Sequence, residues 1–286
     1  MKRSGLLVAA ALAILGAPFP EAHAQASISV ALVLDVEGTV RLVRGKDVAK
    51  AGVTSDIFGD TRVEVESGGR VVMLVLVSGD EATLRGPASA NAAGGSLISN
   101  PVNALTSRKS SVGNVKLRKR DLSQAAIVMR SDEQTVRFPL LSLAGTLTLD
   151  RSPLFRWRAI EGVGPYRFTL MDEAGNELFA MRTDETEARL PGAIALVEGR
   201  AYTWEVRARR ANGLEFSNFG DFSLAPASLR AQALDARPAT GAGFAERVAY
   251  AVWLDSVELV DAARQAWRAL AAERPGDERL VELAGP

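Results

Sequence analysis

Short alternations of apolar and polar residues, ended by glycine turns, fill the first third of the chain. In residues 61–66, Val63 and Val65 alternate with polar and charged residues, which is the period of a half-buried strand. Residues 71–77 (VVMLVLV) are instead an unbroken apolar run. This run is too short to cross a membrane, so it predicts a strand buried on both faces. Short strands with tight turns predict an antiparallel β module over residues 26–98.

The alternation returns in residues 151–226, where aromatic residues occupy many of the apolar positions. Tyr202, Trp204 and Val206 are predicted to face inward, and the residues between them outward. This pattern predicts a second antiparallel β unit. Trp157 and Trp204 both lie on apolar faces, so we expect them in the core and not as exposed platforms for a ligand.

A helical period replaces the alternation in residues 244–286, where apolar residues recur three and four positions apart. The pattern predicts a pair of helices, preceded by a linker over the Ala-, Gly- and Pro-containing residues 227–243. A single helical pair cannot bury its apolar face alone, so it either packs on the sandwich or docks on a partner. Trp253 and Trp267 are the candidate partner contacts, and packing within the chain is the alternative.

The first 24 residues have the pattern of a secretory signal peptide. Lys2 and Arg3 give a positive start, residues 5–17 are apolar, and Ala22-His23-Ala24 supplies an A-x-A cleavage site. An uncleaved membrane anchor is the alternative, although the apolar run is shorter than the roughly 20 residues that span a bilayer. Cleavage after Ala24 would yield a periplasmic or secreted protein without His23, the only histidine.

The mature chain would then contain neither histidine nor cysteine. This composition excludes Ser-His-Asp and Cys-His nucleophile systems, His- or Cys-ligated zinc, haem held by these residues, iron–sulfur clusters and disulfides. The sequence also has no calcium-loop spacing and no Gly-rich loop that would bind phosphate, so we expect no cofactor, no metal site and no enzymatic activity. A carboxylate-dependent glycan hydrolase stays open, because its paired acids lie far apart in sequence.

Charge is balanced, with 34 basic and 34 acidic residues, so no overall field would attract nucleic acid. Residues 99–150 are nevertheless locally basic and are predicted to be a linker containing a short helix over 121–130 and strands beyond it. The candidate partner-binding cations of this segment are Arg108, Lys109, Lys116, Arg118, Lys119 and Arg120. They form either a solvated linker or a patch for acidic wall polymer or lipid phosphate.

The first β module resembles the FecR-type periplasmic domain. The resemblance is carried by Gly38-Thr39-Val40, Gly59-Asp60, the strand from Gly68 to Leu76, Ser78-Gly79 and the closing residues 84–89. Regulators of that family relay an outer-membrane transport signal to a sigma factor, with a membrane helix and a cytoplasmic segment ahead of this domain. Here a signal peptide pattern precedes it.

The later units carry resemblances of their own. The series Leu196-x-x-Gly199-x-x-Tyr202-x-Trp204-x-Val206-x-Ala208 resembles a strand of fibronectin type III and immunoglobulin-like sandwiches. That resemblance implies a tyrosine corner at Tyr202 and an early core tryptophan at Trp157. Ala263, Trp267 and Pro275 roughly match a tetratricopeptide-type helical hairpin, which in that family exposes a groove for peptides.

The chain is thus predicted to be mainly β: a FecR-like antiparallel module, an immunoglobulin or fibronectin III-like β-sandwich and a small C-terminal helical hairpin. We expect a non-catalytic exported binding or scaffold protein, whose partner is an envelope protein or a cell-wall polysaccharide, with no membrane span in the mature chain. A FecR-type sensor or regulator of transmembrane signalling is the alternative. Two β folds that serve as scaffolds name no ligand by themselves.

Overall fold

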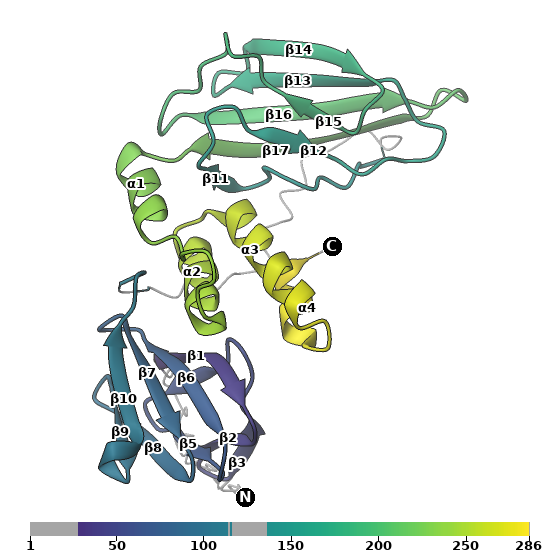
Figure 1. Ribbon diagram of the computed structural model, residues 1–286. Helices are drawn as coiled ribbons and strands as arrows, with labels where there is room; N and C mark the ends of the chain where they lie inside the picture. Colours follow the sequence, from purple (N-terminus) through teal and green to yellow (C-terminus); the bar gives the residue numbers. More distant parts are fainter. Residues whose placement is uncertain (1–27, 114, 116–135, 286) are drawn as a thin grey trace, which may run out of the picture.

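A computed structural model describes residues 28–113, 115 and 136–285. Two β-sandwiches lie at opposite ends, with the C-terminal helices between them (Figure 1). The predicted fold class, mainly β with a small helical part, is confirmed. Among the described residues, no helix combines the length and apolarity needed to cross a bilayer. The predicted signal peptide and His23 lie outside the described residues.

The first sandwich consists of two five-stranded antiparallel sheets. One has the strand order β10-β7-β6-β1-β4 and the other β3-β2-β5-β8-β9. The strands are β1 (Ser29–Glu37), β2 (Val40–Arg44), β3 (Asp47–Lys50), β4 (Asp56–Phe58), β5 (Arg62–Val65), β6 (Arg70–Val75), β7 (Asp80–Arg85), β8 (Ala88–Ala93), β9 (Ser96–Asn100) and β10 (Leu105–Lys109), with a 3₁₀ turn at Val102–Ala104.

Strand β6 is buried on both faces, as the apolar run predicts, but it ends at Val75, and Val77 at the end of that run is exposed. Val71 and Met73 point into the core between the two sheets. Val72 and Leu74 point the other way, into a second cluster that is shared with the helices. Alternating residues of a strand face opposite sides, so a strand without polar positions requires a layer on each side.

The first sandwich extends further than the predicted boundary at residue 98. Strand β9 crosses that boundary, and β10, in the predicted basic linker, pairs antiparallel with β7 from Leu105 opposite Leu84 to Lys109 opposite Asp80. The polar sequence of β10 is that of an exposed edge strand, whose five residues are all exposed or half-buried. An edge strand needs no apolar face, and so its pattern is easily taken for a linker.

The second sandwich packs a five-stranded sheet against a two-stranded one. Their strand orders are β11-β17-β16-β13-β14 and β12-β15. The strands are β11 (Thr146–Thr148), β12 (Leu154–Arg156), β13 (Tyr166–Asp172), β14 (Glu177–Thr183), β15 (Glu187–Arg189), β16 (Ala201–Arg209) and β17 (Glu215–Leu224). Strand β11 runs parallel to β17, and the other pairs are antiparallel.

Two detailed predictions for this sandwich are confirmed. The Val197 amide donates a hydrogen bond to the Tyr202 hydroxyl at 2.8 Å, which is the tie expected of a tyrosine corner. Trp157 and Trp204 are 1% and 0% exposed, within an aromatic core that includes Phe155 and Phe168. Neither indole is available to stack on a ligand.

The second sandwich also begins before residue 151. Val136 forms a bridge to Phe216, Phe138 is buried in the core, and β11 adds an edge strand to the larger sheet. Both ends of the predicted linker over residues 99–150 therefore belong to sandwiches. The short helix predicted over 121–130 lies outside the described residues.

Four helices follow the second sandwich, where a linker and a helical pair are predicted. They are α1 (Ala227–Asp235), α2 (Phe244–Ser256), α3 (Val260–Glu273) and α4 (Glu278–Ala284). Helix α1 occupies part of the predicted linker over 227–243, because its sequence ASLRAQALD has good helix formers and its Pro and Gly residues come after it. Helices α2 and α3 form the predicted hairpin, and α4 packs on α3.

Candidate functional site

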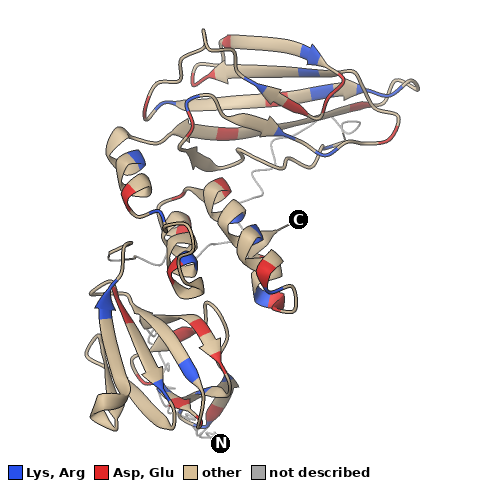
Figure 2. Ribbon diagram, viewed as in Figure 1, with Lys and Arg blue, Asp and Glu red and all other residues tan. Residues whose placement is uncertain are grey.

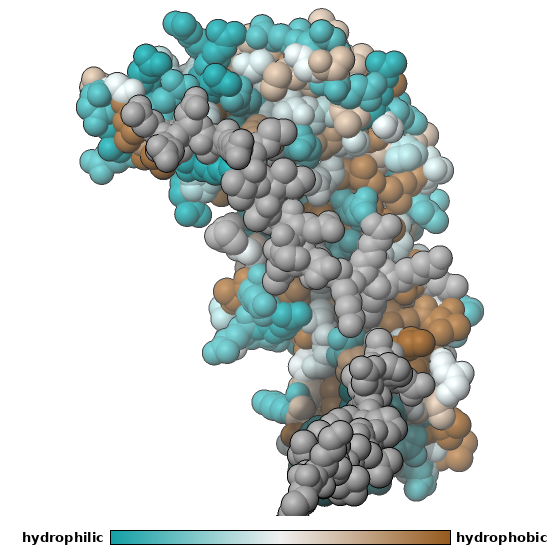
Figure 3. Space-filling model, turned by 180° about the vertical axis from the view of Figure 1, so that it is seen from behind, coloured by the Kyte–Doolittle hydropathy of each residue, from teal (hydrophilic) through white to brown (hydrophobic). Residues whose placement is uncertain are grey.

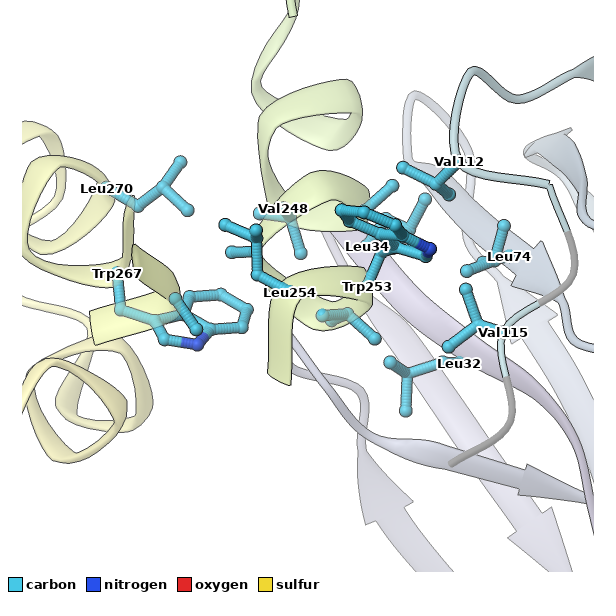
Figure 4. Close-up of a cluster of buried hydrophobic side chains, with 14 of the residues drawn as sticks. Leu32, Leu34, Leu74, Val112, Val115, Val248, Trp253, Leu254, Trp267 and Leu270 are labelled. Atoms are coloured by element: carbon cyan, nitrogen blue, oxygen red, sulfur yellow. The ribbon is translucent and has the colours of Figure 1, made fainter. Parts of the chain in front are cut away.

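The helices contact the outer face of the first sandwich through a shared buried cluster. Leu32 and Leu34 of β1 and Leu74 of β6 share one buried cluster with Val248 and Leu254 of α2 (Figure 4). The helices therefore supply the second layer that the apolar outer face of this sheet requires. Burying apolar surface at about 25 cal/mol per Å² makes such a shared core a strong attachment.

A charged pocket of about 350 Å³ opens beside this apolar contact. It lies between the outer face of the first sandwich, the beginning of α2 and the residue that follows α3. Its charged lining residues are Asp35, Glu37, Arg70, Glu81, Arg108, Glu246 and Arg274.

Asp35 joins the sandwich to the helices. The residue is 3% exposed, and its carboxylate accepts hydrogen bonds at 2.8 Å from Arg70 of β6 and from Arg274 after α3. The Arg274 guanidinium also lies over the ring of Phe244, 3.4 Å from its centroid. A buried carboxylate held by two arginines fixes the position of the helices on the sheet.

Arg70 carries a second acid at the rim of the pocket. Its guanidinium hydrogen-bonds Glu37 at 2.5 Å and holds the pKa of this exposed carboxyl below its usual value. The same contact raises the pKa of Arg70. Arg70 is therefore committed to two carboxylates of β1.

The two described members of the predicted basic patch lie on β10 and form ion pairs. Arg108 donates to the buried carboxylate of Glu81 at 2.6 Å and lies 3.8 Å from Glu246 of α2. Lys109 is 2.8 Å from Asp80, and its hydrogen bond lowers the pKa of that carboxyl. Arg108 and Lys109 therefore belong to a strand of the first sandwich and not to a linker. Lys116, Arg118, Lys119 and Arg120 lie outside the described residues.

Trp253 and Trp267, the other predicted partner contacts, are buried within the chain. Trp253 is 5% exposed and stacks on Tyr250, with ring centroids 6.0 Å apart. Trp267 is 2% exposed, and its Nε1 donates to Asp255 at 2.8 Å. Both indoles belong to the shared cluster (Figure 4). Both tryptophans therefore pack within their own chain, as the alternative interpretation expects, and they are not exposed for a partner.

The helices also contact the second sandwich. The Leu143 amide donates to the carboxylate of Asp261 in the first turn of α3. The Leu147 amide of β11 donates to the Glu258 carbonyl at 2.9 Å. Burial raises the pKa of Asp261, outweighing the opposing effects of the Leu143 amide and Arg264. The helical unit is therefore bound to both sandwiches.

This arrangement is suited to holding domains together. Each of the four pocket carboxylates lies within 4 Å of an arginine. Among residues 28–113, 115 and 136–285, no group of three or more His, Cys, Asp or Glu side chains could hold a metal ion. Sequence reasoning missed the Asp35–Arg274 pair. Its one signal was Asp35 itself, a charge that interrupts the apolar strand SVALVLDVE.

Comparisons with known proteins give only distant likenesses. No protein-family model and no curated protein match the chain. CopC from Methylosinus trichosporium OB3b aligns at 16% identity over 32% of this chain and 95% of CopC, with a TM-score of 0.23. A tetra-tandem repeat from the extending region of a large adhesion protein aligns at 13% identity and a TM-score of 0.21, over 69% of this chain and 42% of that one. TM-scores this low identify neither a family nor a ligand.

Proposed function

We propose that this chain is a non-catalytic, exported binding or scaffold protein that engages an envelope protein or glycan partner. One observation carries the proposal. The C-terminal helices share a core with the first sandwich and hydrogen-bond to the second, so the chain uses its last 60 or so residues to join two sandwiches. A protein built to present two surfaces in one arrangement needs such a joint, whereas an enzyme needs a cleft with available catalytic groups.

The charged pocket supports the binding role over a hydrolytic one. Its two most buried carboxylates, Asp35 and Glu81, accept hydrogen bonds from arginines. A glycosidase needs two carboxyl groups that face the substrate on either side of a bond, one of them free to hold a proton. Here the acids face arginines of their own chain.

Export rests on the n-region, apolar run and A-x-A pattern of residues 1–24. Cell fractionation followed by N-terminal sequencing tests it. We expect a periplasmic or secreted chain that begins at Gln25. An intact Met1 on cytosolic protein would refute export and with it the envelope partner.

Binding is tested by crosslinking the tagged chain in the native envelope and identifying what co-purifies. We expect one protein or glycan to be recovered repeatedly from independent preparations. The Asp35→Ala variant, whose helix joint is weakened, should capture less of it, and the Asp60→Ala variant, altered at an exposed ion pair, should capture as much as wild type. Recovery of the chain alone in every preparation would contradict the proposal.

A further inference from the structure

Four arginines gather on the outer face of the second sandwich. On β13, Arg167 stands directly opposite Arg182 of β14 on one side and Arg207 of β16 on the other. Arg209 lies two residues further along β16 and so points to the same face. Figure 2 shows the corresponding basic bands aligned across β14, β13 and β16. We refer to these four residues as the arginine row.

The arginine row places like charges opposite each other on neighbouring strands, which is unusual in a β-sheet. Like charges directly opposite each other on neighbouring strands destabilise the pairing. Three of the arginines have an acidic neighbour: Arg167 is 3.2 Å from Glu177, Arg207 is 2.6 Å from Glu205, and Arg209 is 3.0 Å from Glu215. Arg182 is exposed, and the described part of the chain provides it with no carboxylate within 4 Å.

A hollow of about 360 Å³ lies against the row. All four arginines line it, together with Tyr166 and a single acid, Glu215. A guanidinium has five N–H donors, and one carboxylate neighbour uses at most two of them, so each arginine keeps donors for another acceptor. Three of these side chains are more than half exposed, which leaves those donors accessible.

The place of the row in the fold suits an external ligand. It lies toward the hairpin between β16 and β17, at the end of the sandwich opposite α1 (Figure 1). Hydrophilic side chains predominate over the upper end of this sandwich in the view from behind (Figure 3). The face also carries an exposed aromatic ring, because Phe219 of β17, opposite Glu205, is 43% exposed.

These features select the chemistry of the ligand. The planar fork of arginine matches the oxygens of carboxylate, phosphate and sulfate groups. Neighbouring strands are about 4.8 Å apart, so the row offers guanidinium groups at repeated steps along an open face, as a polymer with repeated anionic groups requires. An exposed ring beside the row provides the apolar contact that a sugar face uses. The balanced charge of the chain disfavours nucleic acid.

We propose that the arginine row binds the anionic groups of an acidic polysaccharide. The inference rests on the proposed binding function and narrows its partner to the glycan class. The ligand lies across β14, β13 and β16, its carboxylate, sulfate or phosphate groups accept hydrogen bonds from the row, and Arg182 contributes the charge that no described neighbour balances.

The test uses the purified mature chain and measures its affinity for dextran sulfate and polygalacturonate, with neutral dextran and inorganic phosphate as comparison ligands. We expect binding to both anionic polymers that weakens with salt, little binding to neutral dextran, and much weaker binding to free phosphate. The Arg182→Gln/Arg207→Gln variant should bind the polymers at least about tenfold more weakly, because it loses two sets of charge-assisted hydrogen bonds.

The matched control is Arg156→Gln/Arg189→Gln on the two-stranded sheet of the same sandwich, which removes the same charge from side chains of similar exposure. This variant should retain wild-type affinity.

Equal losses in both variants, or no binding to either polymer, would overturn the proposal. Row-dependent binding to phosphatidylglycerol vesicles without polymer binding would replace the glycan by a membrane surface. If the row variant captured the same envelope partner as wild type, the row proposal would fall while the binding function stood.

Discussion

The backbone amide and the backbone carbonyl of Leu143 each form a hydrogen bond, one with helix α3 and the other with Trp204 of β16. Its amide donates to Asp261 of α3, and its carbonyl accepts a hydrogen bond from the Trp204 indole at 2.7 Å. Leu143 has a φ of 51°, a left-handed conformation that is uncommon for a leucine. These two bonds offset the energetic cost of that conformation, and they attach α3 to the core of the second sandwich.

The charge of Asp261 is expected to make this attachment depend on pH. Because burial raises the pKa of Asp261 above its usual 3.8, the folded state holds this proton more tightly than the unfolded chain does. The contribution of the group to the free energy of unfolding is therefore complete below pH 3.8 and is lost as the pH rises through the raised pKa.

Asp261→Asn keeps an acceptor for the Leu143 amide and removes the titration. The free energy of unfolding of the variant should therefore rise relative to wild type as the pH increases from 3.8, and then level off. Urea denaturation at a series of pH values measures this difference. A difference that is constant with pH, or that falls as pH rises, would show that burial does not govern this carboxyl.

Gly220 is expected to be intolerant of any side chain. A Cβ atom at this position would lie 2.7 Å from the Leu143 carbonyl oxygen and 2.8 Å from Trp204 Nε1. Gly220→Ala should therefore lower the free energy of unfolding by about 1–3 kcal/mol through overpacking. Gly192→Ala is the control, since nothing lies within 4 Å of the position that a Cβ atom would take there and its backbone needs no positive φ. Equal stability of the two variants would contradict the close contact.

The Asp35 carboxylate is expected to be more important for stability than any exposed ion pair. Asp35→Ala leaves Arg70 and Arg274 without their shared acceptor at the joint, and we expect a loss of about 3 kcal/mol in the free energy of unfolding. Asp60→Ala removes a partner of Arg44 whose carboxylate is 60% exposed, so solvent already screens this pair and its loss should cost far less than the loss of Asp35. Chemical denaturation compares the two, and similar losses would argue against Asp35 as the joint.

The tyrosine corner gives a prediction within the second sandwich alone. Tyr202→Phe removes the hydroxyl that accepts from the Val197 amide, so this backbone donor loses its partner. We expect the free energy of unfolding to fall by about 1–3 kcal/mol. Thermal and urea unfolding measure it. An unchanged free energy of unfolding in the Tyr202→Phe variant would mean that the hydroxyl stabilises the turn no more than water does.

The sequence predicted those strands whose buried positions form a regular pattern along a continuous stretch of the chain. The alternation around Trp204 located β16 and its core side, and the unbroken run at residues 71–77 predicted burial of β6 on both faces. It could not show what covers the outer face of β6, because the covering helices come about 175 residues later. Leu74 and Trp253 meet only when the chain returns to its first domain.

The candidate site was beyond prediction for the same reason. Arg274 and Asp35 are 239 residues apart. Asp35 is unusual as a charge within an apolar strand, but nothing in the sequence links it to Arg274, which resembles an ordinary surface charge. The arginine row was hidden as well, since the alternation assigns Arg167 and Arg207 to the outer face but does not give the register that puts them opposite each other. Register depends on hydrogen bonding between strands that are distant in sequence.

The central claim is that the helices hold the two sandwiches in one fixed arrangement. The chain has no cysteine, so spin labels can be placed at Ser107→Cys in β10 and Leu178→Cys in β14 without removing native thiols. Pulsed electron paramagnetic resonance then measures the distance between the sandwiches. We predict a single narrow distance distribution that broadens when Asp35→Ala is added. A distribution already broad in the otherwise wild-type chain would contradict the claim.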